Sequence, residues 1–360
     1  MRLPPDKRQV VQLPDWPDNL RQLWEAGLAP APGRLVRYHA PRRRDATNDI
    51  ARKAFGWLLR VMRDHGIAHD GLRPSEWISP DVMELFIEDL IAAENCNNSI
   101  ITKVFGVRRS MKVIESDYDS SWMTTPGGVP IRALLPIERH RVPLVGITVL
   151  YDWVLGMLAH AVTIEDPQQR ALKLRNALIL GVMVARAPRV RSVAAMRLGK
   201  NVKVLNGEMW ICFAGDDLKI PGRSLEYRLP PELPSFLERY INVERKISLN
   251  GQTHDALWVG QDGAPLATIG VAAVVTRAAR SRFDYGFGPH RFRYELATAL
   301  ARDYPDNPGL AAAILGVSLK VAERYYTQAL EDESVSLIAS HLERERARTR
   351  GMARRKFGAR

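Results

Sequence analysis

Apolar residues recur every three or four positions through most of the chain, which is the spacing typical of amphipathic helices. In the first half of the chain this pattern predicts helices over residues 49–63, 82–93 and 98–115. The second of these follows Ser79-Pro80, and proline is favoured in the first turn of a helix, where its missing N–H costs no hydrogen bond. We therefore expect a small, all-helical domain at residues 46–123.

The second half combines helical spacing with one stretch of strand-like segments. Three short segments rich in β-branched and aromatic residues, separated by turns, are expected to form strands at residues 202–205, 209–213 and 224–229. Asn206-Gly207 is typical of a two-residue hairpin turn, so the segments should pair as an antiparallel meander. Helical spacing covers residues 149–162, 167–187, 233–247 and 270–281. The expected fold class is mainly α with a small antiparallel sheet, an α+β arrangement.

Prolines and basic residues mark the expected limits of the domains. Residues 1–45 are rich in proline and arginine, which predicts an extended basic arm with at most one short helix near residues 20–26. Residues 124–143 hold Pro126-Gly127-Gly128 and further prolines, so we interpret them as a linker. The second domain is then expected at residues 144–345, followed by a basic tail at 346–360.

The charge of the chain indicates a polyanionic partner. The 360 residues carry 52 Lys and Arg against 40 Asp and Glu, a formal net charge of +12. Double-stranded DNA is the partner that this excess favours; the alternative is that the charge only keeps the protein soluble. Candidate DNA-binding residues lie in the arm and on the helix predicted at 98–115: Arg42, Arg43, Arg44, Lys103, Arg108, Arg109 and Lys112.

Other function classes are not favoured. No apolar run reaches the length of about 18 residues that a membrane helix requires, and the first residues lack the apolar region of a secretory signal. Cys96 and Cys212 are isolated, without metal-ligand spacing, which indicates a reducing cytoplasm. We expect no cofactor, no metal and no membrane partner.

Candidate chemistry lies near the end of the chain. His290 and Arg293 are spaced i, i+3, which on a helix places an imidazole beside a guanidinium. A guanidinium can bind two phosphate oxygens, and an imidazole can exchange a proton near neutral pH. The same spacing recurs at other histidines, but only here does a tyrosine, Tyr326, follow beyond a Leu315-Gly316 turn. Arginine, histidine and a tyrosine nucleophile together indicate attack on a phosphodiester.

Four motifs in this order resemble the tyrosine recombinase (phage integrase) family, over about residues 140–330. Arg189, after a helix, matches the family's first catalytic arginine, and Lys219 matches its hairpin lysine. His290 and Arg293 match the His-x-x-Arg motif, and Tyr326 matches the nucleophile. The helical domain before them looks like that family's core-binding domain, so the resemblance implies a core-binding domain followed by a catalytic domain.

The sequence departs from the family pattern at three places. Val317 stands where the family has histidine or tryptophan after Leu-Gly, Ser192 stands at a position that is usually acidic, and Ala187-Pro188 replaces the usual context of the first arginine. Tyr325 is the alternative nucleophile. Arg186 and Arg191 are the alternatives to Arg189.

The resemblance implies that Arg189 and Arg293 stabilise charge on the phosphate, that His290 is a base or proton relay, and that Lys219 protonates the departing 5′ oxygen. We expect a site-specific recombinase or integrase that forms a 3′-phosphotyrosyl link and works as a multimer of recombinase subunits on DNA, without metal or ATP. Integration or excision of a mobile element in a bacterial cytoplasm is the expected task. The alternatives are a recombinase-like accessory protein that binds DNA without cutting it, and a relaxing topoisomerase.

Overall fold

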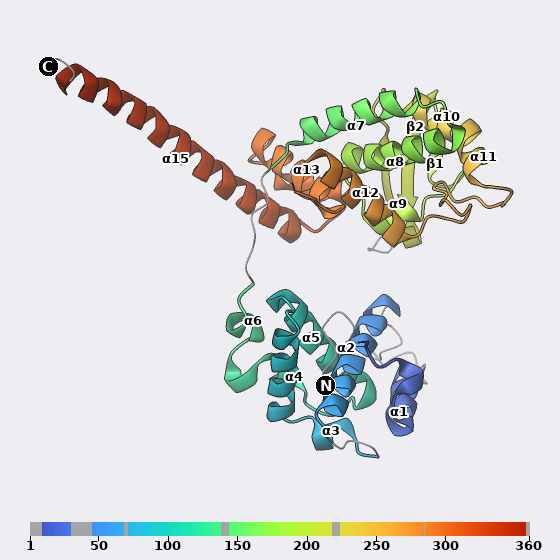
Figure 1. Cartoon of the computed structure of the whole chain (residues 1–360), viewed down its shortest axis with the longest axis vertical. Helices are drawn as coiled ribbons and strands as arrows, with labels where there is room; N and C mark the ends of the chain where they lie inside the picture. The colour runs from blue at the N-terminus through green and yellow to red at the C-terminus, as the bar shows by residue number, and fades with distance from the viewer. Residues whose placement is uncertain are drawn as a thin grey trace. The chain divides into compact units, whose positions relative to one another are not determined.

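The computed structural model describes residues 9–29, 45–67, 71–137, 144–217, 224–283 and 285–357. The chain divides into two compact units, Met1–Arg141 and Val142–Arg360 (Figure 1). Each unit has its own buried apolar core.

Unit 1 is built from helices around a core that lies between α2 and α5. The described helices are α1 (Asp18–Leu28), α2 (Asp45–Asp64), α3 (Pro74–Trp77), α4 (Pro80–Ala92), α5 (Asn97–Ile114) and α6 (Ile131–Leu134), with 3-10 turns at Leu13–Asp15, Ser121–Thr124 and Pro126–Gly128. A Cβ at Gly106 would lie 2.4 Å from the Cβ of Ala54, so the glycine allows α5 to cross α2 closely. Ser110 Oγ donates to the carbonyl of Ala51 across the same contact, at 2.8 Å.

The short helix expected near residues 20–26 is present as α1, but it packs into the core of unit 1 instead of belonging to an extended arm. Trp16, Leu20 and Trp24 are buried in the core of unit 1, and the rings of Trp16 and Phe55 have centroids 5.0 Å apart. Leu20 and Trp24 are spaced i, i+4 on one face of α1, and Trp16 packs against Trp24 from the turn before the helix, with ring centroids 5.7 Å apart. The high proline and arginine content of residues 1–45 hid this short apolar stripe.

The segment expected as a linker also contributes to unit 1. Ile131 on α6 is 2% exposed and belongs to the same core. The prolines around it limit the regular elements to single turns, but they do not prevent the segment from packing. The described part of unit 1 therefore continues to residue 137.

Unit 2 is organised around one buried helix, α8. The described helices are α7 (Ile147–Ala161), α8 (Pro167–Arg186), α9 (Val190–Ala194), α10 (Pro234–Arg239), α11 (Arg245–Ser248), α12 (Thr268–Arg282), α13 (His290–Asp303), α14 (Pro308–Leu315) and α15 (Leu319–Phe357), with a π-helical turn at Tyr240–Glu244. Helix α8 begins where Asp166 caps it by accepting from Gln169 N at 2.6 Å. It ends at Ala187, whose φ of 46° is left-handed. Helices α7, α12 and α13 all pack on it.

A small sheet packs on the same core. Strands β1 (Val202–Leu205), β2 (Glu208–Ala214) and β3 (Ser224–Arg228) pair antiparallel in the order β1-β2-β3. Asn206 and Gly207 join the first two with φ values of 52° and 77°, as the hairpin turn requires. Ile211, Phe213 and Tyr227 point into the core. The predicted fold class, mainly α with a small antiparallel meander, is confirmed.

Helix α15 begins against the core and continues away from it. It packs on α13 and α14, and Ala322 in its first turns is fully buried. Further along, Leu337, Ile338 and Leu342 are between 57% and 61% exposed, and Figure 1 shows this part of the helix (red) running beyond the rest of unit 2. Over the part of the chain that the structure describes, we find no helix with the length and apolar character of a membrane span.

Candidate active site

Arg293 connects three segments that the sequence predicted to work together. It lies on the first turn of α13 and is only 6% exposed. Its Nη1 donates to the carbonyl of Ala187 at 2.6 Å, and its Nη2 donates to the carbonyl of Leu315 at 2.7 Å. One guanidinium therefore holds the end of α8 and the end of α14 against the start of α13.

Arg189 lies at the start of α9, two residues after the turn that Arg293 holds. Proline at position 188 and the left-handed Ala187 turn the chain sharply between α8 and α9. Arg189 is partly buried, and its Nη2 lies 3.4 Å from the carbonyl oxygen of Gly316. The two predicted arginines thus contact neighbouring carbonyls of the same turn, at Leu315 and Gly316.

The two alternatives to Arg189 lie in different surroundings. Arg186 donates to the carbonyls of Ile314 and Glu226, both at 3.2 Å, and its guanidinium lies over the ring of Tyr227. Burial lowers the pKa of Arg186. Arg191 is exposed on α9. Arg186 therefore connects α8, α14 and β3. Of the three arginines, Arg189 is the one whose guanidinium contacts the carbonyl of Gly316.

His290 is the first residue of α13, at the surface and one turn before Arg293. Partial burial of its ring lowers its pKa, and the positive charge of Arg293 lowers it further. Because the ordinary pKa of histidine is about 6.5, His290 is mainly neutral at neutral pH. A neutral imidazole can accept a proton.

Val317 is packed into the core of unit 2. It is 8% exposed, and its N–H donates to the carbonyl of Ala312 at 3.1 Å. The preceding Gly316 has a φ of 58°, which closes α14 with a left-handed cap. A valine side chain cannot donate a hydrogen bond, so position 317 contributes packing.

The remaining predicted residues are described only in part. Lys219 lies outside the described residues, which end at Asp217 on that side of the turn. Tyr325 and Tyr326 lie in α15, and their backbone places both positions about one helical turn after the buried Ala322. Their side chains lie outside the described part, so both remain candidates for the nucleophile.

Two acidic residues that sequence reasoning missed anchor this region. Glu295 is 2% exposed, accepts from the N–H groups of Val145 and Gly146 at 3.0 Å each, and pairs with Arg291 at 2.6 Å. It fixes α13 to the start of α7. The only sequence signal was the i, i+4 spacing of Arg291 and Glu295. Asp217, two residues before Lys219, is the second acidic residue; its carboxylate contacts Lys200 and Asn201.

Three of the basic residues predicted on α5 lie together. Arg108, Arg109 and Lys112 line a pocket of about 220 Å³ with Phe105. The guanidinium of Arg132, on α6, lies 5.8 Å from the centre of the Phe105 ring. We call Arg108, Arg109, Lys112 and Arg132 the basic cluster.

Lys103 lies apart from the basic cluster. Its Nζ donates to Asn95 Oδ1 at 2.7 Å and to Ser99 Oγ at 2.8 Å, and it lies over the ring of Trp57. Burial lowers its pKa. Arg42, Arg43 and Arg44 lie outside the described residues.

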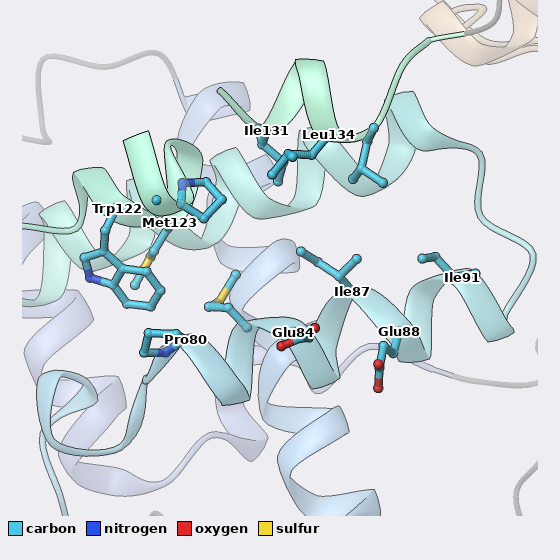
Figure 2. A pocket seen from close by; sticks show the side chains of 13 residues that line it. Pro80, Glu84, Ile87, Glu88, Ile91, Trp122, Met123, Ile131 and Leu134 are labelled. Atoms are coloured by element: carbon cyan, nitrogen blue, oxygen red, sulfur yellow. The ribbon is translucent and has the colours of Figure 1, made fainter. Parts of the chain in front are cut away.

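An apolar groove of about 530 Å³ opens on unit 1. Figure 2 shows its two walls: Pro80, Ile87 and Ile91 on α4, opposite Trp122, Met123, Ile131 and Leu134. Two acidic residues, Glu84 and Glu88, lie among the apolar ones on α4. Part of the opposite wall, including Ile131 and Leu134, comes from residues 124–143, which were expected to form a linker.

Residues 157–333 match the model of the phage integrase family. This range contains every residue of the predicted catalytic set, from Arg189 to Tyr326. The chain carries a phage integrase family domain. A comparison with curated protein sequences returns no match.

Solved structures share the fold of this chain. The XerH site-specific recombinase bound to its difH substrate is 17% identical, with a TM-score of 0.53 over 80% of this chain and 78% of that one. The Tn1549 transposon integrase in complex with transposon right end DNA is 13% identical, with a TM-score of 0.55 over 89% of this chain and 99% of that one. Among the described residues, no group of three or more His, Cys, Asp or Glu side chains has the arrangement of a metal site.

Proposed function

We propose that this protein is a site-specific DNA recombinase of the integrase type, which cuts and rejoins duplex DNA through a 3′-phosphotyrosyl intermediate. The observation that carries the proposal is the pair of hydrogen bonds from Arg293 to Ala187 and Leu315. They bring the arginine turn, the His-x-x-Arg helix and the segment before Tyr326 into one site, within an integrase-family domain.

In the proposed reaction Tyr326 Oη attacks the scissile phosphorus, and the bond from phosphorus to the 5′ oxygen breaks. The phenol proton passes to neutral His290, whose lowered pKa leaves it able to accept. Lys219 gives a proton to the departing 5′ oxygen. Arg189 and Arg293 stabilise the charge that builds on the non-bridging oxygens. Rejoining is the reverse, with a 5′ hydroxyl as nucleophile, and the phosphotyrosyl bond keeps the energy needed to reseal the strand.

Duplex DNA binding is proposed to use the basic cluster of unit 1. The positive charges of Arg108, Arg109 and Lys112 gathered around one pocket suit contact with backbone phosphates, which position a protein on DNA without reading sequence. The XerH and Tn1549 structures contain DNA, which supports the same partner here. We expect recombinase subunits to assemble on the DNA as a multimer, acting on a mobile element in a bacterial cytoplasm.

One observation favours a second function. The buried, apolar Val317 occupies the position at which the family supplies a hydrogen-bond donor. A chain that binds DNA through the basic cluster but does not cut it would be an accessory subunit of a recombination complex.

Covalent trapping separates the two functions. A duplex site is selected with this protein from a random-sequence library, and nicked duplexes are made with the nick at successive positions. A nick beside the scissile phosphate lets the short product diffuse away and traps the enzyme on the DNA. A DNA-linked band that survives denaturation in SDS supports the recombinase. Tight, specific binding with no such band at any nick position supports the accessory protein.

A further inference from the structure

Ser192 connects α9, the helix that follows Arg189, to the residues just before Lys219 by a short hydrogen bond. We call the segment that carries Lys219 between β2 and β3 the lysine turn. Ser192 lies on α9, three residues after Arg189, and is 3% exposed. Its Oγ donates to the backbone carbonyl of Asp217 at 2.5 Å. In the sequence Asp217 is the last described residue before Lys219, two positions away.

The side chain of Asp217 is held as well. It is 6% exposed, accepts from Asn201 Nδ2 at 3.1 Å and pairs with Lys200 Nζ at 3.0 Å. Asn201 is itself fixed, because it donates to the carbonyl of Cys212 at 2.8 Å and accepts from Arg197 N at 2.9 Å. Asp217 is thereby fixed to α9 through its backbone and to the residues before β1 through its carboxylate.

We propose that Ser192 and Asp217 are positioning residues for Lys219. They set where the lysine turn begins relative to Arg189, so that Lys219 Nζ reaches the 5′ oxygen while Arg189 contacts the same phosphate. This inference rests on the proposed recombinase function. It also gives Ser192 the role of a hydrogen-bond donor, which an ionised acidic residue at this position could not have.

A serine hydroxyl donates to the Asp217 carbonyl, whereas an ionised carboxylate at position 192 would accept only. Ser192→Asp would therefore place a negative oxygen against a carbonyl oxygen at a buried site. Although the resembled family is usually acidic here, Ser192→Asp should disrupt the turn in this chain, and Ser192→Thr, which keeps the hydroxyl, should preserve it.

The test uses two versions of one nicked duplex, selected as described above. One has the ordinary 5′ oxygen at the scissile phosphate, and the other has sulfur there. Departure of an alkoxide needs a proton, but a thiolate leaves without one because thiols have a much lower pKa, about 8.5 in cysteine. A variant that lacks only a correctly placed acid is therefore slow on the oxygen duplex and fast on the sulfur duplex.

We expect Ser192→Ala and Asp217→Ala to cut the oxygen duplex about 10-fold or more slowly than the unchanged protein. On the sulfur duplex their rates should return to near that of the unchanged protein, as should that of Lys219→Ala. Affinity for the duplex should not change. Ser281→Ala, which removes an exposed hydroxyl bonded to the Ala278 carbonyl at 2.8 Å, is the matched control and should cut both duplexes normally.

The outcomes separate the inference from the proposed function. If Lys219→Ala is rescued by sulfur but Ser192→Ala stays slow on both duplexes, or cuts the oxygen duplex at the normal rate, the positioning role is wrong and the recombinase proposal stands. If Lys219→Ala is not rescued, or the unchanged protein cuts neither duplex, the assignment of the acid or the activity is itself wrong, and the positioning role is overturned with it. Rescue of Ser192→Ala by sulfur also shows that the variant is folded.

Discussion

Arg293 donates a hydrogen bond of 2.6 Å to the carbonyl of Ala187, the residue that turns the chain toward Arg189. A residue of the second motif thus fixes the backbone that carries the first. With its other hydrogen bond to Leu315, the same guanidinium fixes the segment that leads to Tyr326. The placement of the site therefore depends on one buried side chain.

This dependence predicts a loss of stability in Arg293→Lys. Lysine keeps the charge but cannot span two carbonyls in the planar fork of a guanidinium, and it leaves a buried charge with fewer partners. We expect the free energy of unfolding of unit 2 to fall by about 2–4 kcal/mol, measured by urea denaturation of the full chain. Arg191→Lys, on the exposed side of α9, is the control and should stay within about 0.5 kcal/mol. Equal stabilities for the two variants would contradict this account of Arg293.

The state of His290 predicts how cleavage depends on pH. Burial and Arg293 favour the neutral imidazole, so its pKa in the folded protein lies below the ordinary value. Cleavage should be undiminished at pH 7 and fall as the pH drops below about 6.5 and through that lowered pKa. Protonation also opposes folding, so the contribution of this residue to stability is present above about pH 6.5 and is lost below it. Single-turnover rates from pH 5 to 8 test the first statement.

His290→Gln should be slower at pH 7 and should lose this acid limb of the profile. The control is His160→Gln, at an exposed position of α7, which should reproduce the unchanged profile. An acid limb that persists in His290→Gln would assign it to another group.

Burial of Val317 predicts an effect on stability without an effect on chemistry. Val317→Ala removes two buried methyl groups and should lower the free energy of unfolding by about 1–3 kcal/mol. The cleavage rate of the folded protein should change little, because the side chain offers no donor. Val204, which is 64% exposed on β1, supplies the control Val204→Ala, expected to change stability by less than about 0.5 kcal/mol. A large loss of rate in Val317→Ala without a loss of stability would show that valine acts in the site.

The separation of Lys103 from the basic cluster predicts different salt responses. Each phosphate contact contributes about −0.9 to the slope of log affinity against log salt concentration. Arg108→Ala, Arg109→Ala and Lys112→Ala should each make the slope shallower by up to about that amount. Lys103→Gln should leave it unchanged, because Lys103 lies on the opposite face of α5 from Lys112, where it donates to Asn95 and Ser99. Titrations at several salt concentrations measure the slopes, and a shallower slope for Lys103→Gln would place DNA on the other side of α5.

Helices and strands were predicted correctly where the periodicity of apolar residues was strong and local. The sheet and its Asn206-Gly207 turn follow from residues adjacent in the chain, and so do helices α2, α4, α5, α7, α8 and α12. The length of α15, which continues through the expected basic tail to Phe357, was not predicted. The burial of Trp16 and Ile131 was missed, because short elements between prolines carry too few periods to reveal a buried face. Lys103 seemed equivalent to Arg108 because charge alone does not show which neighbours a side chain contacts.

The sequence indicates which residue types form the candidate site, but it does not show the hydrogen bonds that hold them in place. The arginines and His290 are candidates because of their motifs, since the integrase pattern fixes their order. The bond from Ser192 to Asp217 joins residues 25 positions apart through a backbone carbonyl, and no side-chain pattern encodes that acceptor. The same holds for Glu295, whose partners at Val145 and Gly146 are backbone N–H groups.

The most direct test of the central claim is to identify the residue that becomes linked to DNA. The protein is trapped on the nicked duplex, digested with trypsin and nuclease, and the modified peptide is fragmented in a mass spectrometer. We predict a phosphotyrosyl adduct on Tyr326, which is absent in Tyr326→Phe and retained in Tyr325→Phe. An adduct on Tyr325 would contradict the assigned nucleophile, and specific binding without any adduct would contradict the recombinase itself.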